Sequence, residues 1–588
     1  MKNFLILFVS ILLYSCSKES EPTMYTLNVT SNPIEGGTIS PSGGEYEDGT
    51  VVTIRVTPNT NYQFDRWSGG LSRRETSLSI TMDSNKSIVG NFVLSDSDGD
   101  GVTDDIDTCP DTPSGEEVDE NGCVLVIESI EITNPLDKLV ISRSHQYTVL
   151  GRYTNGESID LSELISLETS NNYSRISDQN KLIGVFSGQS TVKITYNEFE
   201  VLDDLEILHF EEVEPHDFLK TPAENSSLVV PVVILTYIPV NQGIYVDQST
   251  YPIRDYGDKI YDDLSVREVQ NWVLSNDIRT KFSIEEGSKF RGYKNPNSDP
   301  YVGIKVVKQF NYYEIPKTPN PNQTIPSDGD EGWYPNYQEV FDEIDLKYLV
   351  EVMGVKEVWF NSKSLSIPES NMSSPSSGDV SNSFRIQDDL PIYNNTYVVY
   401  GNFIHRWYGE NIHNRGHQIE SQLSYLEKDK ILKNELFWNL FIGRNSNLVE
   451  SENRVKNGRS GDTHFPPNGR HDYDYDNSEL VLSDIGDWKP DNSGEKIEVN
   501  IDTWKFSRVL PVSLPEFGMM EKYRDVTQID DVGGDPQGGW LIYWFQSIPG
   551  KNNNIPYTKN GEEFTLTNWW ELFYNWDESI RDGKTLWE

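Results

Sequence analysis

The chain has 588 residues, which at about 150 residues per domain predicts about four domains. Its 93 acidic and 49 basic residues give a formal net charge of −44, which argues against nucleic acid as a partner, because binding phosphates requires a basic surface. The hydrophobic content of 36% argues against general disorder, and three cysteines are too few for a disulfide-built scaffold.

The N-terminus has the pattern of an export signal. Lys2 precedes an apolar run from Phe4 to Leu13, which has the length of a signal-peptide core and is too short to span a bilayer. The run ends in Leu13-Tyr14-Ser15-Cys16, which resembles the lipobox of bacterial lipoproteins. The resemblance implies that residues 1–16 are a lipoprotein signal peptide with its lipobox cysteine, that cleavage makes Cys16 the new N-terminus, and that Cys16 is acylated.

The residues after Cys16 are polar, and we expect residues 17–24 to form a tether. Ser17-Lys18-Glu19 resembles the surface-export signals of Bacteroidetes lipoproteins. Two or three acyl chains give stable anchoring, whereas one chain is marginal. The resemblance therefore implies a protein that is lipid-anchored in the cell outer membrane and exposed at the surface, with the membrane as a partner.

Residues 25–94 alternate short apolar runs with turn residues, which predicts a small all-β module. Gly49-Thr50-Val51-Val52-Thr53-Ile54, followed by Tyr62-Gln63-Phe64-Asp65-Arg66-Trp67-Ser68-Gly69, resembles bacterial repeat domains related to internalin B-repeats. Such repeats are spacer and adhesion modules. Trp67 could be a ligand platform, but a buried core position is the more common place for tryptophan.

An acidic segment follows this module. Its carboxylates at loop positions 1, 3, 5, 9 and 12 suit an oxygen-ligated calcium ion: Asp96, Asp98, Asp100, Asp104 and Asp107. The alternative is a disordered acidic linker. The whole stretch 95–123, with Thr108-Cys109-Pro110-Asp111-Thr112-Pro113 and Asn121-Gly122-Cys123, resembles a thrombospondin type 3 repeat. That resemblance implies bound calcium and a disulfide between Cys109 and Cys123.

Residues 124–213 again alternate, and the spacing of their runs predicts a β-sandwich. Gly151-Arg152-Tyr153-Thr154-Asn155-Gly156 and Gly188-Gln189-Ser190-Thr191-Val192-Lys193-Ile194 resemble bacterial Ig-like domains of the second group. The usual role of these domains is spacing or adhesion.

Residues 214–588 are different in character, since 13 of the 14 tryptophans lie at or after Trp272. The length suffices for a large core, in one domain or two. Apolar runs predict strands, and periodic segments predict helices at Val266–Asn276, Tyr337–Met353, His405–Leu426, Trp540–Ile548 and Trp569–Arg581. The expected fold class is therefore a series of small all-β modules followed by a large α/β or α+β domain.

Histidines cluster in this region: His405, His413, His417, His464 and His471 fall within 67 residues. On a helix, His413, His417 and Glu420 share one narrow face, because they are spaced i, i+4 and i+7. Ile412, Ile419, Leu423 and Leu426 form an adjoining apolar stripe that we expect to be buried. Gly416 lies between these two faces and permits a close approach by another segment.

Two imidazoles and a carboxylate are a plausible ligand set for zinc, with water in the open position. The pattern is not that of the His-Glu-x-x-His metalloproteases, because Asn414 stands where their general-base glutamate would be. The alternative is that His413, His417 and Glu420 form hydrogen bonds in a polar cleft without a metal.

A second polar cluster begins at His464, in a turn-rich loop that runs to His471. It continues as Asp472-Tyr473-Asp474-Tyr475-Asp476, where strand alternation would place three carboxylates on one side. This cluster could supply further metal ligands, an acid and base pair, or groups that contact sugars. The candidate catalytic residues are therefore His413, His417, Glu420, Asp472 and Asp474.

Two functions fit these features. The first is a cell-surface hydrolase, with or without a metal ion, that acts on an extracellular glycan or peptide. The second is a non-catalytic adhesin or glycan-binding lipoprotein. A modular stalk can display either, so the N-terminal modules do not distinguish the two functions.

Overall fold

The computed structural model describes residues 21–243, 245–247, 265–314, 335–362, 370–378, 380–381, 390–404, 408–427, 435–443, 459–504 and 536–588. The chain forms two compact units: Met1–Thr133, Thr148–Ile165 and Tyr196–Phe199 make the first, and Asn134–Tyr147, Ser166–Thr195 and Glu200–Glu588 make the second. The expected signal peptide, Cys16 and His405 lie outside the described residues. Among the described residues, no helix is long and apolar enough to cross a membrane.

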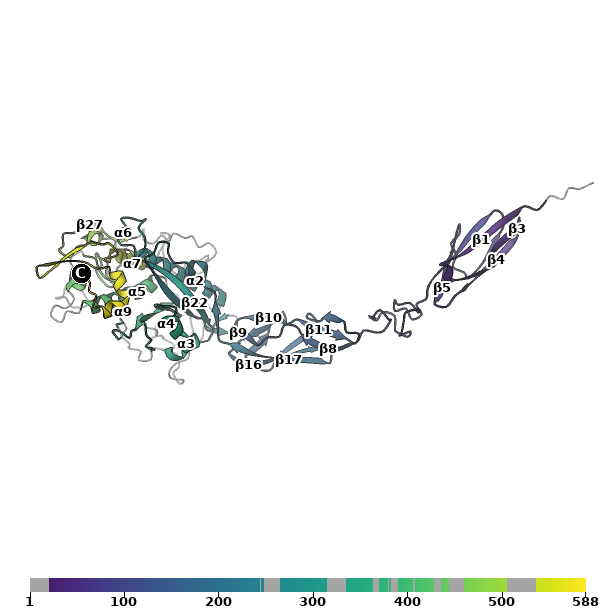
Figure 1. The fold of residues 1–588 in the computed structure, drawn as a ribbon, viewed down its shortest axis with the longest axis horizontal. Coiled ribbons are helices and arrows are strands. Elements are labelled where there is room, and N and C mark those ends of the chain that lie inside the picture. Colours follow the sequence, from purple (N-terminus) through teal and green to yellow (C-terminus); the bar gives the residue numbers. More distant parts are fainter. Residues whose placement is uncertain are drawn as a thin grey trace, which may run out of the picture. The chain divides into compact units, whose positions relative to one another are not determined.

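The N-terminal module is all-β, as expected, and appears in purple in Figure 1. Alternate residues of its strands point inward, and they pack around Trp67, which is fully buried. The prediction that Trp67 is a core residue is therefore confirmed. Two sheets have the orders β3-β1-β7-β5 and β2-β4-β6. Their strands are β1 (Met24–Asn32), β2 (Gly37–Ser40), β3 (Gly43–Glu47), β4 (Val51–Pro58), β5 (Tyr62–Ser68), β6 (Ser77–Thr81) and β7 (Lys86–Leu94).

Residues 127–208 form three further sheets. In the first unit, β8 (Ile127–Ile132), β11 (Val149–Tyr153) and β12 (Ser158–Asp160) make one sheet. The other two sheets have the orders β13-β16-β17-β9 and β10-β15-β14. Their strands are β9 (Lys138–Val140), β10 (Ser144–His145), β13 (Ser166–Thr169), β14 (Ser174–Ile176), β15 (Leu182–Gly184), β16 (Gly188–Tyr196) and β17 (Phe199–Leu208).

The C-terminal region is built on a six-stranded sheet of order β18-β22-β19-β23-β25-β24. The four inner strands are parallel: β22 (Val302–Tyr312), β19 (Leu228–Tyr237), β23 (Glu357–Ser362) and β25 (Tyr397–Phe403). The edge strands β18 (Phe210–Val213) and β24 (Ser370–Ser373) are antiparallel to their neighbours. Because a parallel sheet needs crossover helices, this arrangement makes the region α/β.

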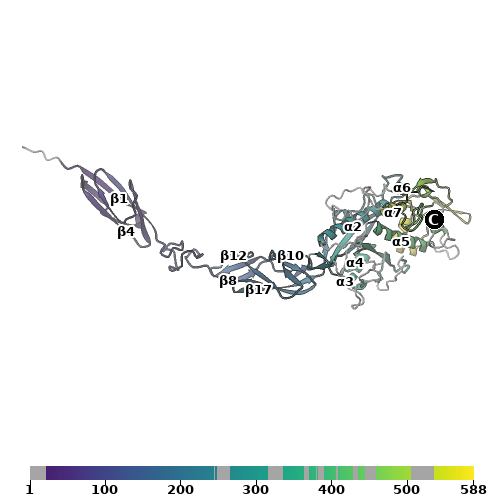
Figure 2. The same ribbon diagram turned by 180° about the vertical axis from the view of Figure 1, so that it is seen from behind.

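Helices lie on both faces of this sheet (Figures 1 and 2). α2 (Val266–Gly287), α5 (Tyr408–Leu426) and α7 (Pro536–Ser547) lie on one side, and α3 (Tyr337–Glu343) and α4 (Leu346–Glu351) lie on the other. A hydrophobic core lies on each face of the sheet, and strand β19 contributes to both. Val232 and Ile234 belong to one core, and Val233 and Leu235 belong to the other. Because β19 is buried on both faces, its sequence is a nearly continuous apolar run and does not alternate with polar residues.

Two segments that were each predicted to form one helix form two helices instead. The segment expected at 337–353 divides into α3 and α4, because Asp345 between them adopts a left-handed φ of 50° and caps α4. The segment expected at 569–581 divides at Asn575 into α8 (Trp569–Tyr574) and α9 (Trp576–Arg581).

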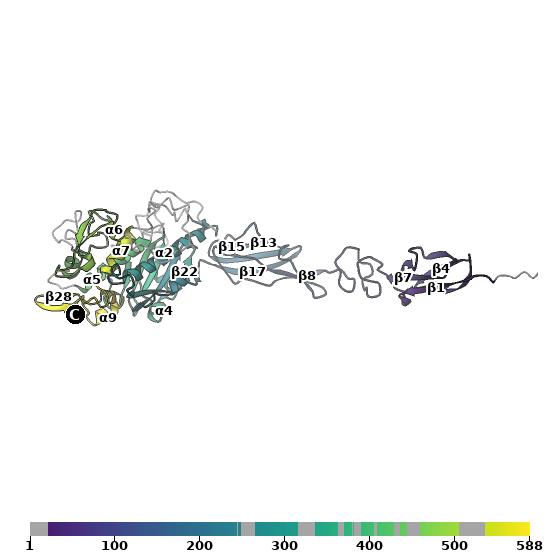
Figure 3. The same cartoon turned by 90° about the horizontal axis from the view of Figure 1, so that it is seen from above.

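The remaining elements are short. They are α1 (Asp217–Lys220), β20 (Val240–Asn241), β21 (Tyr245–Val246), a π-helix (Glu435–Ile442), β26 (Val481–Ser483), β27 (Ile497–Val499), α6 (Ile501–Trp504), β28 (Pro556–Lys559) and β29 (Glu562–Thr565). The C-terminus lies beside the β28–β29 hairpin (Figure 3), where Glu588 exchanges backbone hydrogen bonds with Thr565. The last residues are therefore fixed to the domain.

Candidate metal centre

Helix α5 is buried on nearly all sides, which is unusual for so polar a sequence. Its sheet-facing side carries polar groups with specific partners: the Asn414 side chain donates to Gly401 O (2.6 Å), and Ser370 donates to Gln418 (2.8 Å). The predicted burial of Ile412, Ile419 and Leu423 is confirmed, whereas Leu426, at the end of the helix, is only partly buried. His413, His417 and Glu420 occupy a different face, as the helical spacing predicted, and meet the loop that contains His464.

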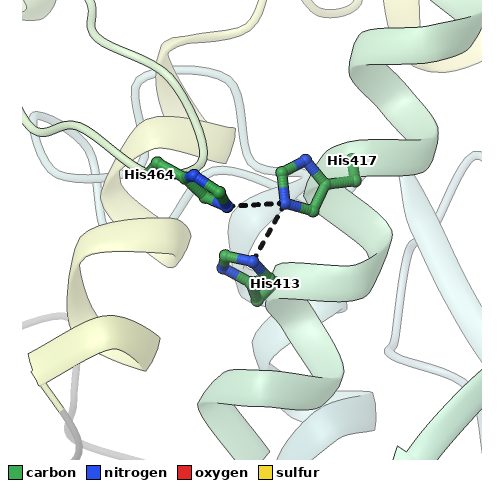
Figure 4. Close-up of side chains that lie close together, drawn as sticks. All are labelled: His413, His417 and His464. Atoms are coloured by element: carbon green, nitrogen blue, oxygen red, sulfur yellow. Dashed lines mark hydrogen bonds between the residues drawn. The ribbon is translucent and has the colours of Figure 1, made fainter. Parts of the chain in front are cut away.

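Three imidazoles converge at this face (Figure 4). Nε2 of His417 lies 2.9 Å from Nε2 of His413 and 2.9 Å from Nε2 of His464. The ligand nitrogens of the three residues all lie within 4.8 Å of one another. His413 and His417 are buried, and His464 is partly buried. The structure thus joins the two predicted histidines of α5 with one from a loop about fifty residues later.

The loop carrying His464 is held against α5 by contacts from several elements. The indole N–H groups of Trp540 and Trp544 on α7 donate to the carbonyls of Asp462 (3.1 Å) and Gly461 (3.0 Å). Thr463 donates from its backbone N–H and its hydroxyl to Glu420 Oε1 (2.9 and 2.7 Å). Gly416 makes the approach possible, since a Cβ there would lie 2.7 Å from Thr463 Oγ1.

The second nitrogen of each ring, Nδ1, also has a neighbouring oxygen. His417 Nδ1 lies 3.0 Å from Glu420 Oε2, and His464 Nδ1 lies 3.5 Å from Asp472 Oδ1. His413 Nδ1 lies 3.4 Å from the hydroxyl of Tyr475, which donates its own proton to Thr463 O (2.8 Å). Each Nδ1 thus faces an oxygen that can accept its proton. With the proton on Nδ1 of each ring, Nε2 is the nitrogen that can bind a metal ion.

This donor set fits a divalent metal ion. Zinc binds imidazole nitrogen at about 2.0–2.1 Å, so two ligands of a tetrahedral site lie about 3.3 Å apart. The observed separations of 2.9 Å need an adjustment of only a few tenths of an ångström. Three lone pairs that point at one place repel each other, and a proton can bridge only one pair at a time. A cation with three ligand positions removes the repulsion of all three.

Burial governs the electrostatics around the cluster. Burial lowers the pKa of His464, and the charge of His417 lowers it further. Burial raises the pKa of Asp462 to about 7, and the charge of Glu420 adds to that shift. At Glu420 burial raises the pKa, but the hydrogen bonds from His417 and Thr463 outweigh it and hold the pKa below its usual value. Glu420 is therefore the ionised partner of the cluster.

Two predictions about the acidic residues need correction. Glu420 does not join the clustered nitrogens, because its two oxygens lie at His417 Nδ1 and at Thr463; the third member of the cluster is His464. Residues 472–476 form turns, not a strand, and Tyr473 has a left-handed φ of 63°. The three aspartates therefore do not share one face.

Asp472 and Asp474 occupy different environments. The side chain of Asp472 is 57% exposed and lies on the Nδ1 side of His464, away from the converging Nε2 atoms. Asp474 is buried and accepts from Arg470 N (2.8 Å) and Asn477 Nδ2 (2.7 Å), so it stabilises the loop. Neither carboxylate faces the centre of the histidine cluster directly.

A second group of possible ligands lies in the acidic segment. Carboxylate oxygens of Asp96, Asp98 and Asp100 lie within 4.8 Å of one another. Asp100 Oδ2 is buried and has no hydrogen-bond partner among the described residues. Asp104 accepts from Ser97, and Asp107 accepts from Cys109 N. Cys109 and Cys123 form a disulfide, as the resemblance implied.

Comparison with known proteins identifies one module. Residues 27–96 match the family described as divergent InlB B-repeat domain. The match covers the N-terminal module and agrees with the resemblance of residues 25–94 to internalin-type repeats.

Other similarities are short or weak. The chain is 55% identical to outer membrane porin F of Pseudomonas aeruginosa over 40 residues, which are 7% of this chain and 11% of the porin. It is 54% identical to an alpha-agarase of Thalassotalea agarivorans over 33 residues, 6% of this chain and 2% of the agarase. The chain thus spans only a small part of either relative.

Solved structures give only remote similarity. Domains 4 and 5 of the S-layer protein SbsC align over 32% of this chain and 70% of that chain, with 12% identity and a TM-score of 0.13. Immunoglobulin domains 1–5 of Sidekick-1 align over 37% of this chain and 43% of theirs, with 10% identity and a TM-score of 0.10. At these TM-scores neither alignment supports an argument about function.

Proposed function

We propose that this chain is a lipid-anchored bacterial surface protein whose C-terminal α/β domain is a divalent-metal-dependent hydrolase. The observation that carries the proposal is the convergence of His413, His417 and His464 Nε2 atoms, each ring oriented by an acceptor at Nδ1. Three protein ligands leave a coordination position for water, as in catalytic zinc sites.

The metal would act as a Lewis acid and lower the pKa of bound water toward neutrality. The chain's own residues hold the site in shape. Glu420 orients His417 and at the same time fixes Thr463, the residue before His464. Asp472 orients His464 from the exposed side. Acceptors behind metal-binding histidines raise the basicity of the rings and fix their direction.

The substrate class in this proposal is an extracellular glycan or peptide. Its support is the position of the domain after a series of modules, one of which belongs to a repeat family found by comparison. Acylation at Cys16 would place the domain at the cell surface, attached to the outer membrane. Calcium bound at Asp96, Asp98 and Asp100 would order the acidic segment, because carboxylates at this density repel without a cation.

The test measures metal in the full mature chain. After purification from medium with zinc, elemental mass spectrometry is expected to find one zinc per chain. His417→Ala and His464→Ala should each lose it. His471→Ala is the matched control, because His471 lies on the same loop, its side chain is 74% exposed, and it is outside the cluster. Full zinc occupancy in His464→Ala would contradict the proposed ligand set.

A second measurement separates hydrolase from adhesin. The zinc-loaded chain and the His464→Ala variant are incubated with soluble polysaccharides and peptides, and both released fragments and retained ligand are measured. Cleavage that requires zinc supports the hydrolase. Retention without cleavage, unchanged in the variant, would instead assign the domain to ligand binding.

A further inference from the structure

A second polar site lies on the side of α5 that faces away from the three histidines. A partly open cavity of about 340 Å³ lies between the amino ends of β23 and β25, helix α5, and helices α8 and α9. Lys356, Glu357, Arg415 and Asp577 line it with polar groups. Val398, Ile419 and Phe573 supply apolar walls. The size is within the range of small-molecule sites.

Arg415 is the buried cation of this cavity, with its side chain 3% exposed. Its guanidinium lies over the rings of Trp359 (4.6 Å) and Tyr400 (4.3 Å). It donates to Asn411 O (2.6 Å) and makes a long contact of 3.4 Å with Glu357. Its Nε–H has no hydrogen-bond partner among the described residues. A guanidinium has five N–H donors, and leaving one unpaired in the interior costs free energy.

Lys356 is the second cation. Its ammonium group donates to Tyr574 O at 2.8 Å. An ammonium group has three N–H donors, so one acceptor from the protein leaves capacity for others. Burial lowers the pKa of Lys356, and the nearby charges of Asp577 and Glu578 oppose that shift only in part. An additional acceptor at this position would offset the cost of burying the charge.

The acidic groups of the cavity are, in contrast, well supplied with donors. Glu357 accepts from Trp359 Nε1 (2.7 Å) and the hydroxyl of Tyr574 (2.9 Å). Asp577 accepts from Thr396 N and Oγ1 (both 2.8 Å) and from Ser376. The protein therefore pairs its acids with donors, whereas Arg415 Nε–H has no acceptor among the described residues and Lys356 has one protein acceptor for its three N–H donors. A ligand that complements this lining must bring acceptors.

We propose that this cavity binds a small organic monocarboxylate, with its carboxylate between Arg415 and Lys356 and its hydrocarbon part against Val398, Ile419 and Phe573. A carboxylate matches the planar donor geometry of a guanidinium. A monoanion fits better than a phosphate dianion, because three acidic residues (Glu357, Asp577 and Glu578) line the cavity beside three basic ones (Lys356, Arg415 and Arg581). The inference does not depend on the metal centre, since none of the three histidines lines the cavity.

The test is calorimetric titration of the full mature chain, with and without added zinc. The probes are butyrate, hexanoate and benzoate, with butyramide and benzamide as uncharged counterparts and inorganic phosphate as the alternative anion. We expect the carboxylates to bind and the amides to bind far more weakly. Lys356→Met keeps the length and bulk of the side chain and removes the charge, and it should weaken carboxylate binding by about 10- to 100-fold. Lys347→Met is the control, because Lys347 is an exposed lysine on α4 outside the cavity.

Three results would overturn the inference: no carboxylate binds, amides bind as tightly as acids, or Lys356→Met binds like the unchanged chain. Phosphate binding alone would reject the monocarboxylate class. Arg415→Gln provides a second measurement of carboxylate affinity. Because Arg415 also packs against Trp359 and Tyr400 of the sheet, the melting temperature of this variant is measured as well. Lys356→Met alone decides the outcome if Arg415→Gln fails to fold.

Discussion

Glu420 has a role that its residue type alone did not reveal. A carboxylate at i+3 from a histidine could bind a metal or orient the ring, and only the tertiary contacts distinguish the two. Here Oε2 accepts from His417 and Oε1 accepts from Thr463, so both oxygens are engaged behind the cluster. The residue joins two segments that each carry a candidate ligand.

Replacing this carboxylate by an amide should weaken metal binding. In Glu420→Gln one end of the side chain becomes an NH₂ donor, and either orientation places that donor opposite an existing donor on His417 or Thr463. We expect zinc affinity to fall by about 10- to 100-fold, as for other residues that orient metal ligands. Competition with a chromophoric chelator measures it. Glu410→Gln, on the same helix, should leave the affinity unchanged; an equal loss in both variants would contradict the specific role of Glu420.

Asp277 makes stability depend on pH. Its carboxyl is fully buried, and burial raises its pKa from 3.8 to about 8, against the opposing effects of Asn361 and Arg415. Between these values the folded state keeps a proton that the unfolded state releases. The free energy of unfolding therefore falls as pH rises from about 4 to about 8, by up to about 1.4 kcal/mol per pH unit from this group.

Asp277→Asn should remove this dependence while retaining an oxygen for Asn361. We expect the variant to lose less stability than the unchanged chain between pH 5 and pH 7.5, measured by urea unfolding at each pH. Asp299→Asn, at an exposed position, is the control. Parallel pH profiles for the Asp277→Asn variant and the unchanged chain would show that another group causes the dependence.

At the scale of elements, α5 organises the C-terminal domain. One side of this helix contacts the sheet through Asn414 and Gln418, and another meets the 459–475 loop through His413 and His417. A helix that is polar on two sides and buried on both is predicted poorly by hydrophobic periodicity, because that method treats polar faces as exposed. The His/Glu face was nevertheless predictable, since 3.6 residues per turn fixes it.

Gly416 is the position where α5 and the loop come closest. In Gly416→Ala the new Cβ would lie 2.7 Å from Thr463 Oγ1 and 3.0 Å from its Cγ2. The loop must move, and His464 moves with it, so we expect weaker zinc binding although alanine favours the helix by about 0.5–1 kcal/mol. Adding Thr463→Ala removes the clashing atoms and should restore part of the affinity. Zinc affinity unchanged in Gly416→Ala would contradict the close approach.

At the scale of the whole molecule, part of the net negative charge is concentrated in the acidic segment at residues 95–123. The acidic segment holds Asp96, Asp98 and Asp100 close together, and Asp100 Oδ2 is buried without a hydrogen-bond partner among the described residues. We expect calcium titration of the chelator-stripped full chain to show binding that falls by at least one site in an Asp98→Asn, Asp100→Asn variant. Asp111→Asn, exposed in the same segment, is the control. Equal stoichiometry in all three proteins would contradict a calcium site here.

Local patterns in the sequence determined the modular order, the β character of the first modules, the position of α5 and the face shared by His413 and His417. These features follow from spacing along one strand or one turn of helix, which nearby residues set. The tertiary structure decided the rest: that His464 and not Glu420 completes the cluster, that residues 472–476 form turns, and that Arg415 and Lys356 share a cavity. The cluster and the cavity each depend on segments brought together across tens of residues, and the spacing of residues along the chain does not encode which distant segments meet. The turns at 472–476 are local, but the left-handed φ of Tyr473 breaks the alternation from which a strand was predicted.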